Sequence, residues 1–243
     1  MMELIIEQAS SFASDIDFII LVIVILGGFW LFVAEFVFFY FLYKYRRSNN
    51  PKAAYITGEK HSEKKWIHWP HYMVIACDIF IIFFAIKAWY NVKQDLPPAD
   101  DTVRIVGQQW AWTFVHSGPD KQLGTFDDIT TVDELHLKKG LVYHFKLESK
   151  DVLHSFSVPV FRLKQDAVPG RVITGWFKPT KSGTFDVQCA EMCGIGHGAM
   201  AAKVHIHTDS DYTYWENKQT KGHAQKKLNQ QTANLANNKS GDL

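Results

Sequence analysis

The chain has 243 residues, 47% of them hydrophobic, and a formal net charge of +1. This near-neutral balance lacks the basic excess of a nucleic-acid-binding protein, so no nucleic-acid partner is expected. The three cysteines form no Cys-x-x-Cys-His sequence, which excludes a covalently attached c-type haem in this chain.

The first third of the chain contains two long apolar runs. A short N-terminal segment, residues 1–17, precedes the first run, residues 18–43. At about 1.5 Å of rise per residue, this run exceeds the ~20 residues that cross the hydrocarbon layer of a bilayer. No basic segment precedes it and no small-residue cleavage pattern follows it, so we interpret it as a retained helix. A second run, residues 70–92, predicts a second membrane-spanning helix.

The connecting segment, residues 44–69, is strongly basic and predicts the orientation of both helices. Its acidic residues are Glu59 and Glu63 alone, whereas its basic residues are Lys44, Arg46, Arg47, Lys52, Lys60, Lys64 and Lys65. Because basic loops stay on the cytoplasmic side, we expect both termini on the extracytoplasmic side. A bacterial cytoplasmic membrane fits this arrangement best, and a mitochondrial inner membrane is also compatible with it.

Each apolar run carries one acidic residue, Glu35 in the first and Asp78 in the second. A charged group in lipid is costly and requires a protein or water partner. A place on a proton path is one interpretation. A structural hydrogen bond to a neighbouring helix is the interpretation we favour.

From residue 93 to residue 217 the composition predicts a separate all-β domain. Pro97 and Pro98 mark the junction, since consecutive prolines cannot continue a helix. Short β-prone segments follow, separated by Gly, Pro and Asp clusters; they include residues 102–106, 142–148, 172–177, 184–188 and 201–208. Residues 218–243 are rich in Gln, Asn and Lys, which predicts a disordered tail.

One short stretch near the end of this domain holds a complete set of copper ligands. Its members are Cys189, Glu191, Cys193, His197 and Met200, with His154 upstream. Thiolates, imidazoles and a thioether favour copper or zinc over hard cations, and the thioether favours copper. The alternatives are a disulfide or buried thiols at the two cysteines, and a structural role for the histidine. Convergence of all these residues at ligand spacing argues against them.

The residues around these ligands resemble subunit II of the haem-copper cytochrome c oxidases. The resemblance rests on three stretches: QCAEMCGIGHGAM at residues 188–200, DVLHSF at residues 151–156 and FRLKQDAVPGR at residues 161–171. It implies a two-helix transmembrane hairpin followed by an all-β, cupredoxin-like Greek-key sandwich.

The resemblance also implies a binuclear copper centre of the type called CuA. Cys189 and Cys193 would bridge the two coppers. His154 and Met200 would complete one copper, and His197 with the backbone carbonyl of Glu191 would complete the other. The free carboxylate of Glu191 would bind a magnesium or manganese ion shared with subunit I, for which a hard oxygen ligand is suitable.

Two further residues match positions with roles in that family. Glu63, followed by Trp66 and Pro70, matches a Glu-x-x-Trp-x-x-x-Pro pattern in which the glutamate lies at the cytoplasmic mouth of a proton channel. Trp110 matches the tryptophan through which electrons enter. The alternative for Trp110 is a core position on the same strand face as Trp112.

The expected function is that of an oxidase subunit that passes electrons from a c-type cytochrome, or a haem c subunit, to haem in subunit I. Subunit I would also hold CuB and reduce oxygen to water with proton translocation, and subunit III and membrane lipid are further expected partners. The acidic surface that steers a basic cytochrome looks thin here, with Asp127, Asp128, Asp151 and Asp166 as its candidates. The complete ligand set argues against a quinol oxidase.

Two other functions remain open. A membrane-tethered copper chaperone of the thioredoxin fold would also use Cys-x3-Cys, but it predicts a βαβ pattern and has no need of Met200. A CuA electron carrier for another reductase would leave the paired helices and Glu63 without a purpose. His205 and His207 alternate along a predicted strand and could bind metal adventitiously, although an exposed strand face is the favoured interpretation.

Overall fold

The computed structural model describes residues 6–52 and 55–222. The described residues divide into two compact units, one within residues 14–94 and the other formed by residues 6–13 together with residues 95–222. The first unit is helical and the second is built on β-strands.

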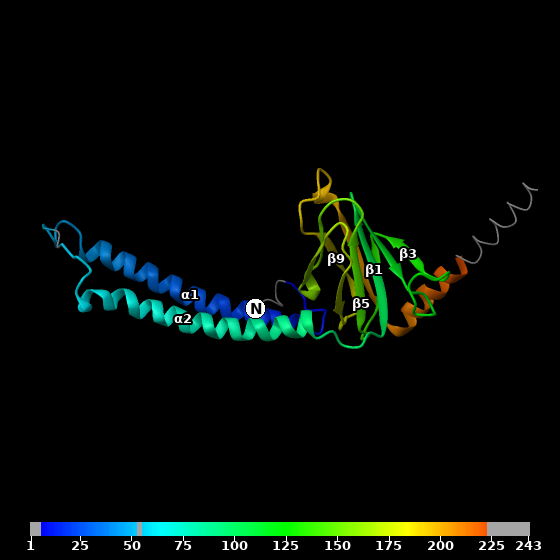
Figure 1. Ribbon diagram of the computed structural model, residues 1–243, viewed down its shortest axis with the longest axis horizontal. Coiled ribbons are helices and arrows are strands. Elements are labelled where there is room, and N and C mark those ends of the chain that lie inside the picture. The colour runs from blue at the N-terminus through cyan, green and yellow to red at the C-terminus, as the bar shows by residue number, and fades with distance from the viewer. Residues whose placement is uncertain (1–5, 53–54, 223–243) are drawn as a thin grey trace, which may run out of the picture. The chain divides into compact units, whose positions relative to one another are not determined.

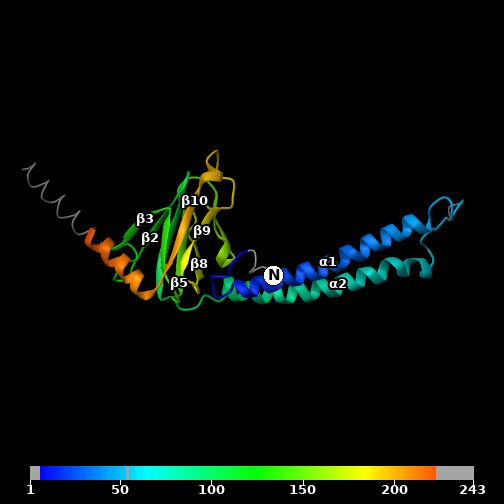
Figure 2. The ribbon, with the colours of Figure 1, turned by 180° about the vertical axis from the view of Figure 1, so that it is seen from behind.

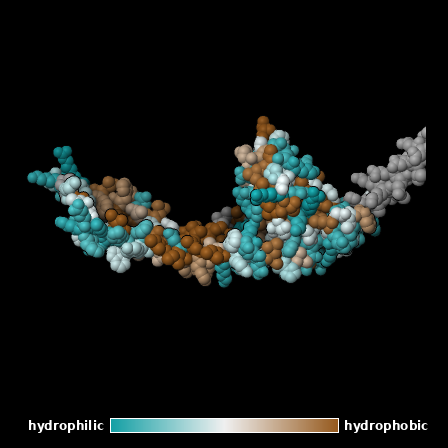
Figure 3. Space-filling view, viewed as in Figure 1, coloured by the Kyte–Doolittle hydropathy of each residue, from teal (hydrophilic) through white to brown (hydrophobic). Residues whose placement is uncertain are grey.

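The helical unit is a hairpin of α1 (Ala13–Lys44) and α2 (His61–Trp89), with a π-helical turn at Tyr90–Gln94. The two helices run side by side (Figures 1 and 2), and the rings of Phe18 and Phe84 meet edge to face at 5.4 Å. Both are long and apolar enough to cross a membrane. Figure 3 shows apolar side chains along the hairpin, with hydrophilic residues gathered at its far end.

Both helices extend beyond the predicted apolar runs. The first begins at Ala13 rather than at residue 18, and the second begins at His61 rather than at residue 70, so residues 61–69 are helical and do not belong to the loop. Hydropathy marks only the apolar part of a helix, whereas polar turns complete the same backbone bonds. Pro70 lies inside α2, where it removes a single backbone donor.

The second unit is a sandwich of two five-stranded sheets, which confirms the predicted architecture of two apolar helices followed by an all-β domain. One sheet has the order β3-β2-β1-β5-β8 and the other the order β4-β10-β9-β6-β7. Its strands are β1 (Asp101–Gln108), β2 (Ala111–His116), β3 (Ile129–Val132), β4 (Glu134–Lys138), β5 (Tyr143–Ser149), β6 (His154–Val158), β7 (Leu163–Ala167), β8 (Ile173–Phe177), β9 (Gly183–Cys189) and β10 (Ala201–His207).

The chain passes repeatedly from one sheet to the other, as a Greek-key sandwich requires. β1 pairs in parallel with β5, and β4 in parallel with β10, while the other pairs are antiparallel. No βαβ unit occurs among the described residues, so the fold predicted for a thioredoxin-like copper donor is absent from that part of the chain.

Alternating side chains fill the space between the sheets. Trp112 and Phe114 of β2, Phe145 of β5 and Phe156 of β6 are completely buried. The fit is close at Gly175 on β8, where an added Cβ would lie 2.3 Å from Cζ of Phe145. This packing makes the sandwich a firm support for the loops at its ends.

The N-terminal segment is part of the β unit. Ala9 donates its backbone N–H to Val160 and accepts one from Thr180, at 2.8 and 2.9 Å. Phe12 is buried and its ring meets that of Trp176 edge to face at 5.3 Å. Residues 6–12 are therefore an ordered extension of the sandwich, which hydropathy alone did not predict.

The other end of the domain corrects two predictions. Residues 209–222 form a helix, so residues 218–222 are ordered, and the rest of the predicted tail lies outside the described residues. The backbone N–H of Asp211 donates to Oγ1 of Thr208 at 3.4 Å, which caps this helix. Tyr212 and Trp215, three residues apart on one face, are buried. His205 and His207 are only partly exposed. The His205 ring stacks on His136, and the His207 ring stacks on Trp215.

Candidate metal centre

The residues predicted to bind copper lie at one end of the sandwich, where β9 passes into β10 (gold in Figure 1). Cys189 is the last residue of β9, and β10 begins directly after Met200. The backbone N–H of Cys189 bonds the carbonyl of Met200 at 3.2 Å, and that of Ala190 bonds Ser155 of β6 at 2.9 Å. Both ends of the loop are thus anchored to neighbouring strands.

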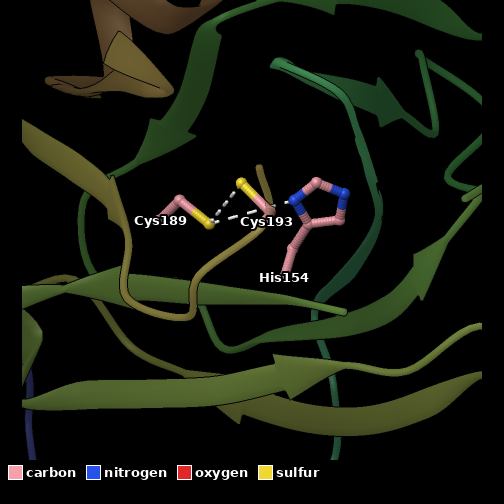
Figure 4. A group of neighbouring side chains, drawn as sticks. All are labelled: His154, Cys189 and Cys193. Atoms are coloured by element: carbon pink, nitrogen blue, oxygen red, sulfur yellow. Dashed lines mark hydrogen bonds between the residues drawn. The ribbon is translucent and has the colours of Figure 1, made fainter. Parts of the chain in front are cut away.

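Two buried thiols form the middle of the site. The sulfur atoms of Cys189 and Cys193 are 3.7 Å apart (Figure 4). A disulfide would bring them to about 2.05 Å, and both cysteines are free. The disulfide alternative is therefore wrong for this structure.

Side-chain and backbone donors surround the two sulfurs. Nδ1 of His154 lies 3.9 Å from the Cys189 sulfur, and the carbonyl oxygen of Glu191 lies 3.3 Å from it. Around the Cys193 sulfur, Nδ1 of His197 is at 3.6 Å and Sδ of Met200 at 3.7 Å. All six residues predicted from the sequence are thereby brought together, and their soft donor set suits copper.

Burial affects the protonation of this thiol pair. It raises the pKa of Cys193 to about 11, and the neighbouring Cys189 thiol adds to the effect. Without a cation the thiol therefore stays protonated at neutral pH. A metal must displace this proton, which makes metal uptake dependent on pH.

Asp151 fixes the orientation of His154. Its Oδ1 accepts Nε2–H of the fully buried His154 imidazole at 2.8 Å, which leaves Nδ1 facing the sulfurs. The carboxylate also accepts backbone N–H groups from Gln109 and Val152, both at 2.7 Å. Burial raises the pKa of Asp151, but these hydrogen bonds outweigh it and lower the pKa overall.

The turn between β1 and β2 packs directly on the metal loop. Nε2 of Gln109 donates to the carbonyl of Cys193 at 2.8 Å, and the indole Nε1 of Trp110 donates to the same oxygen at 3.3 Å. Trp110 precedes β2 and is 41% exposed, whereas Trp112 lies within β2 and is buried. The interpretation that the two tryptophans share a strand face is wrong, because Trp110 lies in the turn before β2 and only Trp112 lies within the strand.

No pattern in the sequence predicts the roles of Gln109 and Gly196. An added Cβ at Gly196 would lie 2.4 Å from Cδ2 of Trp110, so the glycine leaves space for the indole ring. Gly107 of β1 likewise lies against the His154 ring, with its added Cβ at 3.1 Å from Cδ2. These contacts join segments that are far apart in the sequence.

The two other predicted site residues lie in different surroundings. The side chain of Glu191 is partly exposed. Glu63 lies in the first turn of α2, within the helical unit, and its carboxylate accepts the backbone N–H of Gly58 at 3.0 Å. This hydrogen bond joins the segment before α2 to the first turn of the helix.

Comparison with known proteins identifies the family of the chain. Residues 137–207 match the family model described as cytochrome c oxidase subunit II, periplasmic domain. The chain is 43% identical over 141 residues to the alternative cytochrome c oxidase subunit 2 of Bradyrhizobium diazoefficiens, covering 49% of this chain and 51% of that protein. The chain thus spans about half the length of that relative.

Two further similar proteins match different shares of this chain. The periplasmic domain of subunit II of cytochrome oxidase from Bradyrhizobium japonicum is 28% identical, with a TM-score of 0.47, covering 53% of this chain and 99% of that one. The probable cytochrome c oxidase subunit 2 of Rickettsia bellii is 30% identical over 202 residues, which cover 76% of this chain and 71% of that protein. The chain belongs to the cytochrome c oxidase subunit 2 family.

Proposed function

We propose that this chain is subunit II of a terminal oxidase and accepts electrons from a c-type cytochrome at a CuA centre. The observation that carries the proposal is the pair of sulfurs 3.7 Å apart, with two imidazoles, a thioether and a backbone carbonyl around them. A structural zinc site needs only four ligands and no methionine.

Each ligand has a distinct part in this proposal. The thiolates of Cys189 and Cys193 would be shared by the two metal ions. His154 and Met200 would hold one ion, and His197 with the Glu191 carbonyl would hold the other. A copper pair held in this way supplies one-electron transfer with little change in bond length, and the weak thioether helps to set its potential. The anchored loop and the fixed His154 ring keep these donors in place.

Trp110 is the proposed point where electrons enter. Its ring is partly exposed and its N–H is bonded to the backbone of Cys193, so it connects the surface with a ligand. Met192 and Ile195, on the same loop, are 73% and 97% exposed. The donor would therefore dock mainly on this apolar surface. Charged groups would contribute less, because the carboxylate of Asp151 already accepts the backbone N–H of Gln109.

The remaining site residues would act at the boundary with other subunits. The Glu191 carboxylate would hold magnesium or manganese with subunit I, since hard cations prefer oxygen. Glu63 would lie at the entrance of a proton channel in subunit I. That subunit, with its haem and CuB, would reduce oxygen to water with proton translocation, and subunit III would complete the complex.

The N-terminal segment supports the proposed orientation. Residues 6–12 are bonded to the sandwich and directly precede α1. This supports the proposal that the start of α1 and the copper domain would lie on the same side of the membrane. The two helices then place the basic connection between them on the opposite, cytoplasmic side. The copper domain would face the extracytoplasmic space.

The first test is copper reconstitution of the full chain in detergent, followed by metal analysis and electron paramagnetic resonance. The full chain is needed because residues 6–12 and 209–222 both pack on the sandwich. We expect two coppers per chain that share one unpaired electron. Cys193→Ser should abolish this signal, whereas Cys77→Ser, in α2, should keep it. One localised copper that a chelator removes easily would contradict the proposal and favour a copper chaperone.

A further inference from the structure

A second group of ligand-type side chains lies on β4 and β10, and it shares no residue with the copper loop. Glu134, His136 and His205 each offer one ligand atom, and these atoms all lie within 4.8 Å of one another. The parallel pairing of β4 with β10 sets His205 directly opposite His136. β4 is the edge strand of its sheet and β10, labelled in Figure 2, is its neighbour.

Both histidines already have one ring nitrogen engaged. Nδ1 of His136 lies 2.9 Å from Nε2 of His207, and Nδ1 of His205 lies 3.0 Å from Oγ1 of Thr184. Metal-binding histidines usually have the second nitrogen held in this way, because it fixes the tautomer and the direction of the ring. In each ring, Nε2 is then the nitrogen that would bind a metal ion.

The carboxylate is close to one of these nitrogens. Oε2 of Glu134 is 3.6 Å from Nε2 of His136, which is long for a hydrogen bond and leaves space for a cation near both atoms. The nearby cations have other partners, because Lys203 pairs with Asp186 and Lys138 with Asp209. The carboxylate of Glu134 is therefore not neutralised by either lysine.

Ring packing makes this arrangement rigid. The His136 ring stacks on Trp215 of the final helix at 4.3 Å and on His205 at 4.8 Å.

We propose that Glu134, His136 and His205 form a second metal site, which binds a divalent transition ion such as Zn²⁺ and joins β4 to β10. Two imidazoles and one carboxylate, without sulfur, suit zinc with a water molecule at the fourth position. The site lies on the outer side of the sheet, whereas the copper ligands lie at the end of the sandwich.

The test uses the full chain in detergent, loaded with copper so that the cysteine site is filled and then washed with chelator. Zn²⁺ is titrated in competition with a chromophoric chelator at neutral pH. We expect one zinc per chain. Its affinity should fall by about tenfold or more in Glu134→Gln and His205→Gln, and also in Thr184→Val, which removes the anchor of His205. His61→Gln is the control, since this histidine lies in α2.

Zinc X-ray absorption then identifies the ligands. Nitrogen and oxygen scattering without sulfur supports the proposal, whereas sulfur scattering would place the ion at the cysteines and overturn it. Failure of the wild-type chain to bind zinc, or unchanged affinity in Glu134→Gln and His205→Gln, would also overturn it. Glu134 is exposed, so its variant tests the site even if a change at buried His136 prevents folding.

Discussion

The indole N–H of Trp110 donates to the carbonyl oxygen of Cys193 at 3.3 Å, so a partly exposed ring is bonded to the backbone of a proposed metal ligand. The same oxygen accepts the side-chain amide of Gln109 at 2.8 Å. The surface turn and the metal loop are therefore held together at one carbonyl oxygen, and the Gln109 bond remains when the indole N–H is lost.

Trp110→Phe should slow electron transfer from a c-type cytochrome and leave the copper spectrum intact. The phenyl ring retains an aromatic surface but loses the indole N–H. We expect the rate of reduction by the cytochrome to fall by at least about tenfold, or about 1.4 kcal/mol, measured by stopped-flow absorbance. Tyr214→Ala, at an exposed aromatic residue of the final helix, is the control. An unchanged rate in Trp110→Phe would exclude this tryptophan as the point where electrons enter.

Gly196→Ala should weaken copper retention because the new methyl group would overlap the Trp110 ring, 2.4 Å from its Cδ2. The loop or the ring must then move. Copper per chain after dialysis against a chelator measures the effect. Gly198→Ala is a matched control, since an added Cβ there meets no atom within 4 Å. Equal loss of copper in both variants would show that general loop stiffness, and not the Trp110 contact, is responsible.

Asp151→Asn should lower copper affinity by about tenfold to a hundredfold, the usual effect of losing a partner that orients a ligand. The carboxylate accepts three N–H groups, from Gln109, Val152 and His154. The amide of asparagine has only one oxygen that accepts hydrogen bonds, and its NH2 group would face one of these N–H donors. Chelator competition measures the affinity, with Asp186→Asn as a control at an exposed ion pair. Wild-type affinity in Asp151→Asn would show that His154 needs no such orientation.

The stability of the sandwich should depend on pH through His116. Burial, aided by the charge of His207, lowers the pKa of His116 to about 3 from 6.5. Between these two pKa values the unfolded chain binds a proton at His116 that the folded chain does not. The contribution of His116 to the free energy of unfolding is therefore complete above about pH 6.5 and is lost as the pH drops towards 3. Denaturant unfolding at several pH values measures how the free energy of unfolding changes with pH. In His116→Gln this slope should correspond to about one bound proton fewer than in the wild type. Parallel profiles for the two proteins would contradict the assignment.

Local sequence was enough to identify the apolar helices and the six copper-binding candidates. Hydropathy is a property of neighbouring residues, and five of the six ligands fall within residues 189–200. Five of the β-segments were also located close to their observed bounds, such as residues 184–188 within β9. The helix starts were less accurate, because the polar turns before Phe18 and Pro70 carry no hydropathy signal.

Tertiary structure alone decided how distant segments support the site. The hydrogen bonds of Asp151 to Gln109 and of Gln109 to Cys193 join three separate parts of the chain. The meeting of His136 with His205 depends on the parallel register of β4 and β10. Such pairings arise from the packing of whole sheets, which a pattern of neighbouring residues does not encode. The pattern of neighbouring residues thus identified the candidate ligands, whereas the packing of the sheets sets how these side chains are oriented, buried and joined to the surface.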